Sequence, residues 1–112
     1  AEVQYTDDAE VVLVAYGSSS RIALSAVETC RVEGLPVGMI RPITLFPFPH
    51  KPLRDVARQR NPIFLVVELS SGQFAEDVKL TLNCQHPVHL LRRYGGNLIT
   101  VEETLAKIRQ LL

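Results

Sequence analysis

The sequence predicts an α/β fold in which helices cover both faces of a central sheet. Four runs rich in apolar and β-branched residues alternate with four stretches that carry apolar side chains at helical spacing. The apolar runs are continuously hydrophobic, which is typical of parallel strands buried on both faces. The length of 112 residues suits one core, so we expect a single domain over residues 1–112. Because the chain opens at Ala1 without methionine, we expect a piece excised from a larger subunit.

The predicted strands take their bounds from the apolar runs. They cover residues 11–16, 37–41, 63–68 and 88–92. Residues 3–5 form a possible fifth strand, in which apolar and polar side chains alternate, and this pattern suits an edge of the sheet.

The first two predicted helices carry local signals at one end. The first covers residues 20–33 and stops at Gly34, because glycine readily takes the left-handed conformation of a helix C-terminus. The second covers residues 50–60. Its Pro52 falls in the first turn, where the missing amide hydrogen has no partner within the helix.

Each of the last two helices follows a capping-box pattern, a hydroxyl residue with Glu or Gln three positions later. Ser70 and Gln73 introduce the third helix, and Thr100 and Glu103 introduce the fourth. We therefore expect a helix after each of these pairs.

The charge balance argues against a polyanionic partner. Lys and Arg together number 12, as do Asp and Glu, so the formal net charge is 0 and no nucleic acid or anionic membrane is indicated. No apolar run approaches the roughly 20 residues of a membrane-spanning helix, and the first residues do not resemble a secretion signal. We expect a soluble, cytoplasmic protein.

The two cysteines, Cys30 and Cys84, belong to no Cys-x-x-Cys pair or Cys/His cluster. This spacing excludes an iron–sulfur cluster held by the chain alone. We expect both thiols to be reduced, unbridged and largely buried, in a reducing compartment.

If the strands are parallel, the segments that follow them meet at one edge of the sheet, where open α/β folds usually bind ligands. The first of these segments contains Ser18, Ser19 and Arg21. Its hydroxyls, cation and helix N-terminus suit a phosphate or carboxylate. However, it lacks the spacing of a nucleotide-binding loop, and plain helix capping explains it better.

The second segment, residues 41–49, has three prolines and two aromatic residues. Proline fixes φ and removes a backbone donor, so we expect a stiff, extended connector. Phe46 and Phe48 either fold back over the core or face a partner. Their alternation with prolines favours the partner-facing arrangement, which makes both residues candidates for an interface.

The third segment begins at Glu68, at the end of a buried strand. A carboxylate there suits acid–base chemistry, yet no His or second acid stands beside it in the sequence, so we expect an ion pair with Arg41. Gln73 closes this segment, and Arg93 in the last one offers a cation to an anion or a neighbouring subunit. The histidines are scattered, and we assign no catalytic, cofactor-binding or metal-binding residue.

Several short elements occur in a fixed order along nearly the whole chain: Ala15-Tyr16-Gly17-Ser18-Ser19 with Arg21, the Arg-Pro-Ile-Thr and Pro-Phe-Pro elements within residues 38–49, Val66-Val67-Glu68 with Gly72-Gln73, and Arg93 with Gly95-Gly96. Together they resemble the C-terminal domain of the α-type subunit of the 2-oxoacid:ferredoxin oxidoreductases, which use pyruvate, 2-oxoglutarate or 2-oxoisovalerate. The proline–aromatic segment is the most specific element. Departures from the common family residues at Phe46, Leu69, Ser70, Arg92 and Val101 leave the substrate subtype open, and we favour a branched-chain 2-oxoacid.

The resemblance implies a transketolase C-terminal-like fold, a three-layer α/β/α sandwich with a five-stranded mixed sheet whose first strand, residues 3–5, is antiparallel. It implies that the full enzyme decarboxylates a 2-oxoacid oxidatively with thiamine diphosphate and Mg²⁺. Electrons pass through 4Fe-4S clusters to ferredoxin, and an acyl-coenzyme A forms. In that family other domains or subunits hold these groups, so this domain would be non-catalytic, bind no cofactor and pack against its neighbours.

Two alternatives remain. The C-terminal domain of a 2-oxoacid dehydrogenase β subunit shares the fold but serves an enzyme that hands its acyl group to lipoamide, and the proline–aromatic segment favours the ferredoxin-linked family. A stand-alone α/β binding module of the receiver type would need acids at the end of its first central strand. Tyr16 and Gly17 stand there instead.

Overall fold

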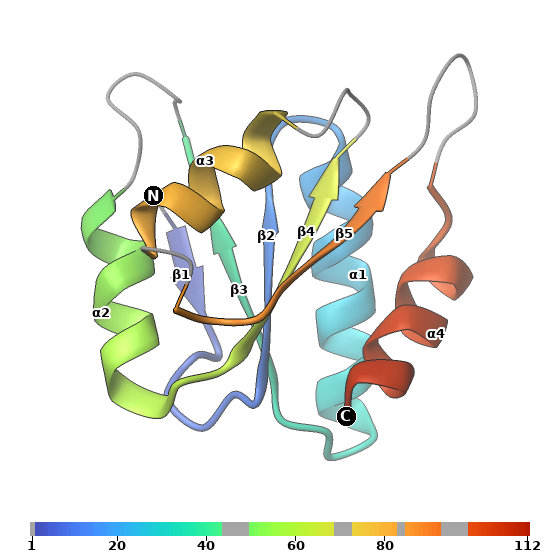
Figure 1. Cartoon of the computed structure of the whole chain (residues 1–112). Helices are drawn as coiled ribbons and strands as arrows, with labels where there is room; N and C mark the ends of the chain where they lie inside the picture. The colour runs from blue at the N-terminus through green and yellow to red at the C-terminus, as the bar shows by residue number, and fades with distance from the viewer. Residues whose placement is uncertain (1, 44–49, 69–72, 83–84, 93–98) are drawn as a thin grey trace.

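Five strands form one mixed sheet in the order β1-β3-β2-β4-β5 (Figure 1). The computed structural model describes residues 2–43, 50–68, 73–82, 85–92 and 99–112. The strands are β1 (Glu2–Gln4), β2 (Val11–Ala15), β3 (Val37–Arg41), β4 (Ile63–Glu68) and β5 (Val88–Arg92).

The strand directions make the sheet mixed. Central β2 pairs in parallel with β3 and β4, and β5 pairs in parallel with β4. β1 lies at one edge and runs antiparallel to β3, with Glu2 opposite Arg41 and Gln4 opposite Met39. The predicted five-stranded mixed sheet with an antiparallel first strand is therefore confirmed.

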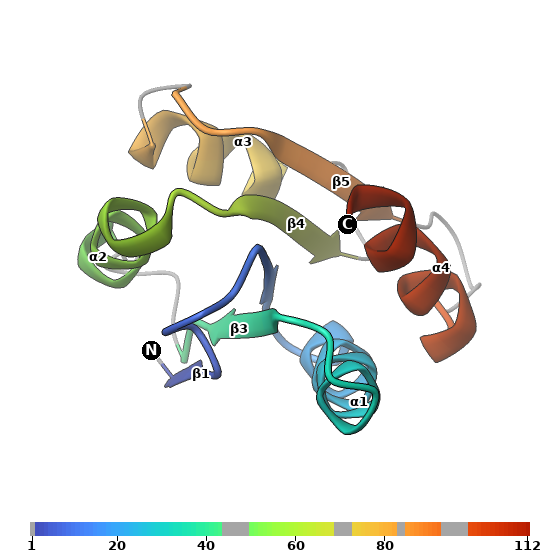
Figure 2. The same ribbon diagram turned by 90° about the horizontal axis from the view of Figure 1, so that it is seen from below.

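Within the described residues, four helices cover the two faces of the sheet. They are α1 (Ser19–Val32), α2 (His50–Arg60), α3 (Gln73–Thr81) and α4 (Val101–Leu111). In Figure 2, α1 and α4 lie on one face, and α2 and α3 lie on the other. This arrangement is the expected three-layer sandwich.

The central strands are buried on both sides because successive residues enter opposite cores. Phe64 and Val66 pack in the core beneath α2 and α3. Leu65 and Val67, which alternate with them along β4, pack in the core beneath α1 and α4. This two-sided burial is the physical reason that the strands are continuously hydrophobic in the sequence.

The end of α1 follows the predicted signal. Gly34 has φ of 80°, and its amide donates to the carbonyl of Arg31 at 3.0 Å. The Leu35 amide donates to the carbonyl of Cys30 at 2.8 Å. These two bonds form a Schellman motif, which explains why α1 stops there.

The start of α4 also follows its predicted signal. Thr100 is the N-cap residue with extended backbone angles, and its Oγ1 accepts from the amide of Glu103 at 3.1 Å. This is the principal hydrogen bond of a capping box.

Gly38 in β3 allows the backbone at Tyr5, just after β1, to lie close to β3. A Cβ atom at this position would lie 2.6 Å from the carbonyl oxygen of Tyr5. Any larger residue would have to displace this backbone, so the site requires glycine.

Most predicted bounds agree with the observed ones. β3, β4, β5 and α2 match the predicted ranges, whereas β1, β2 and α1 differ from them by one residue at one or both ends. Ser70 lies outside the described residues, and α3 begins at Gln73. Within the described ranges, no helix has the length and apolar character needed to cross a membrane.

Candidate functional site

The carboxyl ends of β2, β3, β4 and β5 lie at one edge of the sheet, the upper edge in Figure 1, because these strands are parallel. The predicted site residues follow these ends, and five of them have described side chains: Ser18, Ser19, Arg21, Arg41 and Glu68. Gln73 is the first residue of α3. Phe46, Phe48 and Arg93 lie outside the described residues.

Two serine hydroxyls at the start of α1 hold the turn that joins β2 to this helix. Ser19 is buried, and its Oγ donates toward the carbonyl oxygens of Tyr16 and Val67, each at 2.9 Å. Buried Ser20 donates through its Oγ to the carbonyl of Gly17 at 2.6 Å. The bond to Val67 ties the start of α1 to β4, and the bonds to Tyr16 and Gly17 close the turn before the helix, so the two hydroxyl hydrogens serve the local structure.

Ser18 and Arg21 are the exposed members of the predicted site in this region. Ser18 is the N-cap residue of α1, but it has helical backbone angles and its side chain makes no capping hydrogen bond. The side-chain capping expected here is therefore not made by Ser18. Arg21 is exposed in the first turn of α1. An anion at this edge would meet Ser18, Arg21 and the helix N-terminus.

The predicted ion pair between Glu68 and Arg41 is wrong. The two residues end β4 and β3, and β2 lies between these strands. Side-chain alternation also places them on opposite faces, because Ile40, next to Arg41, shares a core with Val66, two residues before Glu68. Arg41 instead pairs with the carboxylate of Glu2 on β1, at 3.6 Å.

Glu68 joins the end of β4 to the start of α3. Its side chain is buried, and Oε1 accepts from the amide of Ala75 in the first helical turn at 3.4 Å. A carboxylate at this place favours the helix because the first amides of a helix lack partners and carry partial positive charge. This contact is structural.

Sequence reasoning missed Arg31, which connects three segments. Its guanidinium binds the carboxylate of Asp8 through two hydrogen bonds. It also donates to the carbonyls of Tyr5 at 2.6 Å and Val37 at 2.9 Å. These partners lie between 6 and 26 positions away in the sequence, so no local pattern reveals the contact.

The side chains of His50 and His86 contact other segments of the chain. His50 Nδ1 lies 2.8 Å from Thr81 Oγ1, which joins α2 to α3. The ring of His86 packs edge-on against Phe64, with the centroids 6.0 Å apart. His86 also lines a pocket with two arginines of α2. Sequence spacing does not reveal this grouping, because it joins α2 to the segment before β5.

The cysteines and the other residues that commonly bind metals do not form a metal site among the described side chains. Cys30 is a buried free thiol, and burial raises its pKa. Cys84 lies outside the described residues. Among the described side chains, no three of His, Cys, Asp or Glu gather as metal ligands would.

Comparison with known families decides the family. Residues 9–104 match the family model for the pyruvate:ferredoxin oxidoreductase core domain II. The chain belongs to this family. The match begins just before β2 and ends within α4, so core domain II includes the four parallel strands and the edge at which they end. The resemblance inferred from the sequence is confirmed.

Curated relatives of this core domain II are subunits of two oxidoreductases. The chain is 51% identical over 114 residues to the ketoisovalerate oxidoreductase subunit VorB of Methanothermobacter marburgensis, covering 98% of this chain and 32% of that subunit. It is 36% identical over 104 residues to the 2-oxoglutarate synthase subunit KorA of the same organism, covering 93% of this chain and 28% of KorA. The chain therefore spans about a third of the length of these relatives.

Two solved structures share the fold of core domain II. The inactive β4 tetramer of a split-gene transketolase aligns with a TM-score of 0.77 and 21% identity, covering 92% of this chain and 38% of that chain. The 2-oxoglutarate:ferredoxin oxidoreductase from Magnetococcus marinus aligns with a TM-score of 0.74 and 20% identity, covering 92% and 18%. The predicted transketolase C-terminal-like fold is confirmed.

Proposed function

We propose that the chain serves as core domain II in a subunit of a 2-oxoacid:ferredoxin oxidoreductase that acts on ketoisovalerate. The observation that carries this proposal is the 51% identity to VorB across 98% of the chain, against 36% identity to KorA. Because the chain corresponds to 32% of VorB, the remainder of such a subunit would supply other parts of the enzyme.

In the proposed enzyme, ketoisovalerate is decarboxylated oxidatively, its acyl group passes to coenzyme A, and ferredoxin accepts the electrons. When bound, thiamine diphosphate with Mg²⁺ would supply the carbanion stabilisation that decarboxylation needs, and 4Fe-4S clusters would carry the electrons. The described side chains offer no ligand set for a metal, so we assign these groups to other domains and subunits. Calorimetric titration of the 112-residue chain with thiamine diphosphate and Mg²⁺ should give no saturable heat.

We infer that this domain packs against its neighbours through the edge at which the parallel strands end. Two apolar residues that follow these strands are exposed, Tyr16 by 43% and Ile43 by 54%. Ser18 and Arg21 follow Tyr16 within five positions in the sequence, and Ile43 belongs to the proline–aromatic segment. An apolar surface with a polar margin suits contact with another protein surface.

The substrate is tested by assembling the full-length subunit with its partner subunits. The rate of coenzyme A-dependent reduction of a viologen dye is then measured with ketoisovalerate, 2-oxoglutarate and pyruvate. We expect the highest kcat/KM with ketoisovalerate. A preference for 2-oxoglutarate would favour a KorA-like enzyme, and acyl transfer to lipoamide without dye reduction would contradict the ferredoxin-linked assignment.

A further inference from the structure

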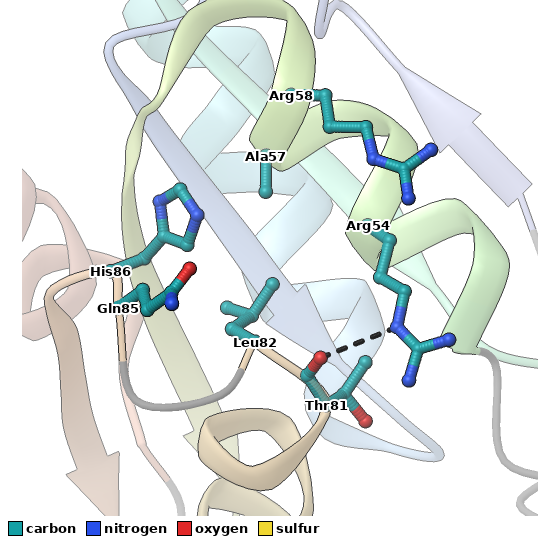
Figure 3. A pocket seen from close by; sticks show the side chains of 7 residues that line it. All are labelled: Arg54, Ala57, Arg58, Thr81, Leu82, Gln85 and His86. Carbon is teal, nitrogen blue, oxygen red and sulfur yellow. Dashed lines mark hydrogen bonds between the residues drawn. The ribbon is translucent and has the colours of Figure 1, made fainter.

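A pocket lies between α2 and the segment that joins α3 to β5, away from the edge described above. Its volume is about 340 Å³. Figure 3 shows side chains from α2 on one side and from the end of α3 and the following segment on the other. The lining residues are Arg54, Ala57, Arg58, Thr81, Leu82, Gln85 and His86.

The pocket lining carries positive charge and no carboxylate. Arg54 and Arg58 are four residues apart on α2 and therefore share one face of the helix. Arg54 Nε donates to the carbonyl of Thr81 at 3.4 Å, which leaves its terminal amino groups for another acceptor. Among the described residues, neither arginine forms an ion pair. The acid on the same helix, Asp55, is instead paired with Lys51 at 2.7 Å.

His86 adds a polar group that the fold itself does not satisfy. Its Nδ1 is buried and has no hydrogen-bond partner among the described residues, although its ring is held edge-on against Phe64. Buried polar atoms in native proteins nearly always have a partner, so the ring of His86 brings unused hydrogen-bonding capacity to this side of the pocket.

We propose that this pocket binds the phosphate group of a small molecule. Guanidinium groups match phosphate oxygens with paired donors, and His86 and Gln85 add polar groups on the other side of the pocket. A phosphate group offers more acceptor oxygens and more negative charge to two arginines than a carboxylate does. The volume of about 340 Å³ also leaves room for an organic group beside the phosphate. Phosphate binding by the chain does not depend on the role proposed above, and only the test in the assembled enzyme rests on that role.

The first test titrates the 112-residue chain with inorganic phosphate at constant ionic strength, with chloride as the balancing anion. Binding is followed through the NMR signals of the arginine Nε–H groups and of the histidine rings. We expect saturable shifts for Arg54, Arg58 and His86. Arg54→Gln and Arg58→Gln should each weaken phosphate binding about tenfold, the loss expected for a charge-assisted hydrogen bond.

Two further variants separate a site from general charge effects. His86→Phe keeps an aromatic ring against Phe64 but removes both ring nitrogens, so it should retain the melting temperature and lose phosphate affinity. Lys107→Gln removes one positive charge on α4, on the opposite face of the sheet, and should bind phosphate as the parent chain does. Shifts that do not saturate, or an equal loss in Lys107→Gln, would overturn the proposal.

A second test asks whether the site is open in the assembled oxidoreductase. Phenylglyoxal modification of Arg54 and Arg58, read by mass spectrometry, should occur without phosphate and should decrease when phosphate is added. If both arginines resist modification without phosphate, another part of the enzyme covers the pocket, and the proposal of a small-molecule site is wrong.

Discussion

Arg31 and Asp8 form a two-pronged ion pair, with Nη1 to Oδ2 at 3.0 Å and Nη2 to Oδ1 at 2.7 Å. The hydrogen bond with Asp8 is the main reason that the pKa of Arg31 lies above its ordinary value. The same guanidinium holds backbone carbonyls of the turn after β1 and of the start of β3. One side chain near the end of α1 therefore fixes how the antiparallel edge strand joins the parallel sheet.

Replacing Arg31 by Lys should lower the free energy of unfolding by about 1–2 kcal/mol. Lysine keeps the charge but lacks the planar set of donors that reaches three acceptors at once. Urea denaturation of both chains measures the change. Arg21→Lys is the matched control, because Arg21 is exposed and forms no ion pair within the described part of the chain. Equal stability of Arg31→Lys and the parent chain would contradict this role.

Cys30 should make stability depend on pH in the alkaline range. Burial raises the pKa of its thiol above the ordinary value of 9.0, and Glu33 adds to this increase. The thiol is thus protonated more strongly in the folded than in the unfolded state. Its contribution is fully present below the unfolded pKa and is lost as pH rises through the folded pKa.

A Cys84→Ser background leaves Cys30 as the only thiol for this measurement. The difference in unfolding free energy between this chain and its Cys30→Ala derivative should decrease between about pH 8 and about pH 10. A difference that stays constant over this range would show that the Cys30 thiol does not ionise differently in the two states.

The two cysteines should not be bridged. A count of two free thiols in the unreduced, denatured parent chain would confirm this, and a lower count would contradict it.

Glu68→Ala should loosen the start of α3. Removing the acceptor of the Ala75 amide costs about 1 kcal/mol, as the loss of a helix cap does, whereas Glu68→Gln keeps an acceptor and should cost less. Hydrogen exchange of the Ala75 amide reports the change at the site itself. Amides of α4 serve as the internal reference, and faster exchange there to the same degree would indicate general destabilisation instead.

Phe46 and Phe48 should act in assembly rather than in the stability of the domain. Anchors of an interface typically cost about 2 kcal/mol or more when cut to Ala, whereas aromatic residues packed over the core cost about 3 kcal/mol or more of domain stability. Phe46→Ala and Phe48→Ala should therefore leave the melting temperature of the 112-residue chain within a few degrees and weaken assembly of the full enzyme. A large loss of stability with assembly intact would show that the rings belong to the core.

Local signals in the sequence were sufficient to predict the helices and strands but not the side-chain contacts between them. Gly34 and Thr100 act within one turn of the helix ends that they set, so their roles follow from short patterns. The partner of Glu68 depends on strand order and on side-chain alternation, which no local pattern contains, and the expected pair with Arg41 failed for that reason. The pocket at His86 is likewise formed by elements distant in sequence.

Co-expression of residues 1–112 with the remainder of a full-length VorB-like subunit and its partner subunits tests the assignment most directly. The measurement is the coenzyme A-dependent oxidation of ketoisovalerate by the purified assembly, with and without the separate 112-residue chain. We predict that the chain co-purifies with the assembly and that activity requires its presence. Full activity in its absence, or a chain that remains apart from the assembly, would contradict the proposal that it is a packing domain of this oxidoreductase.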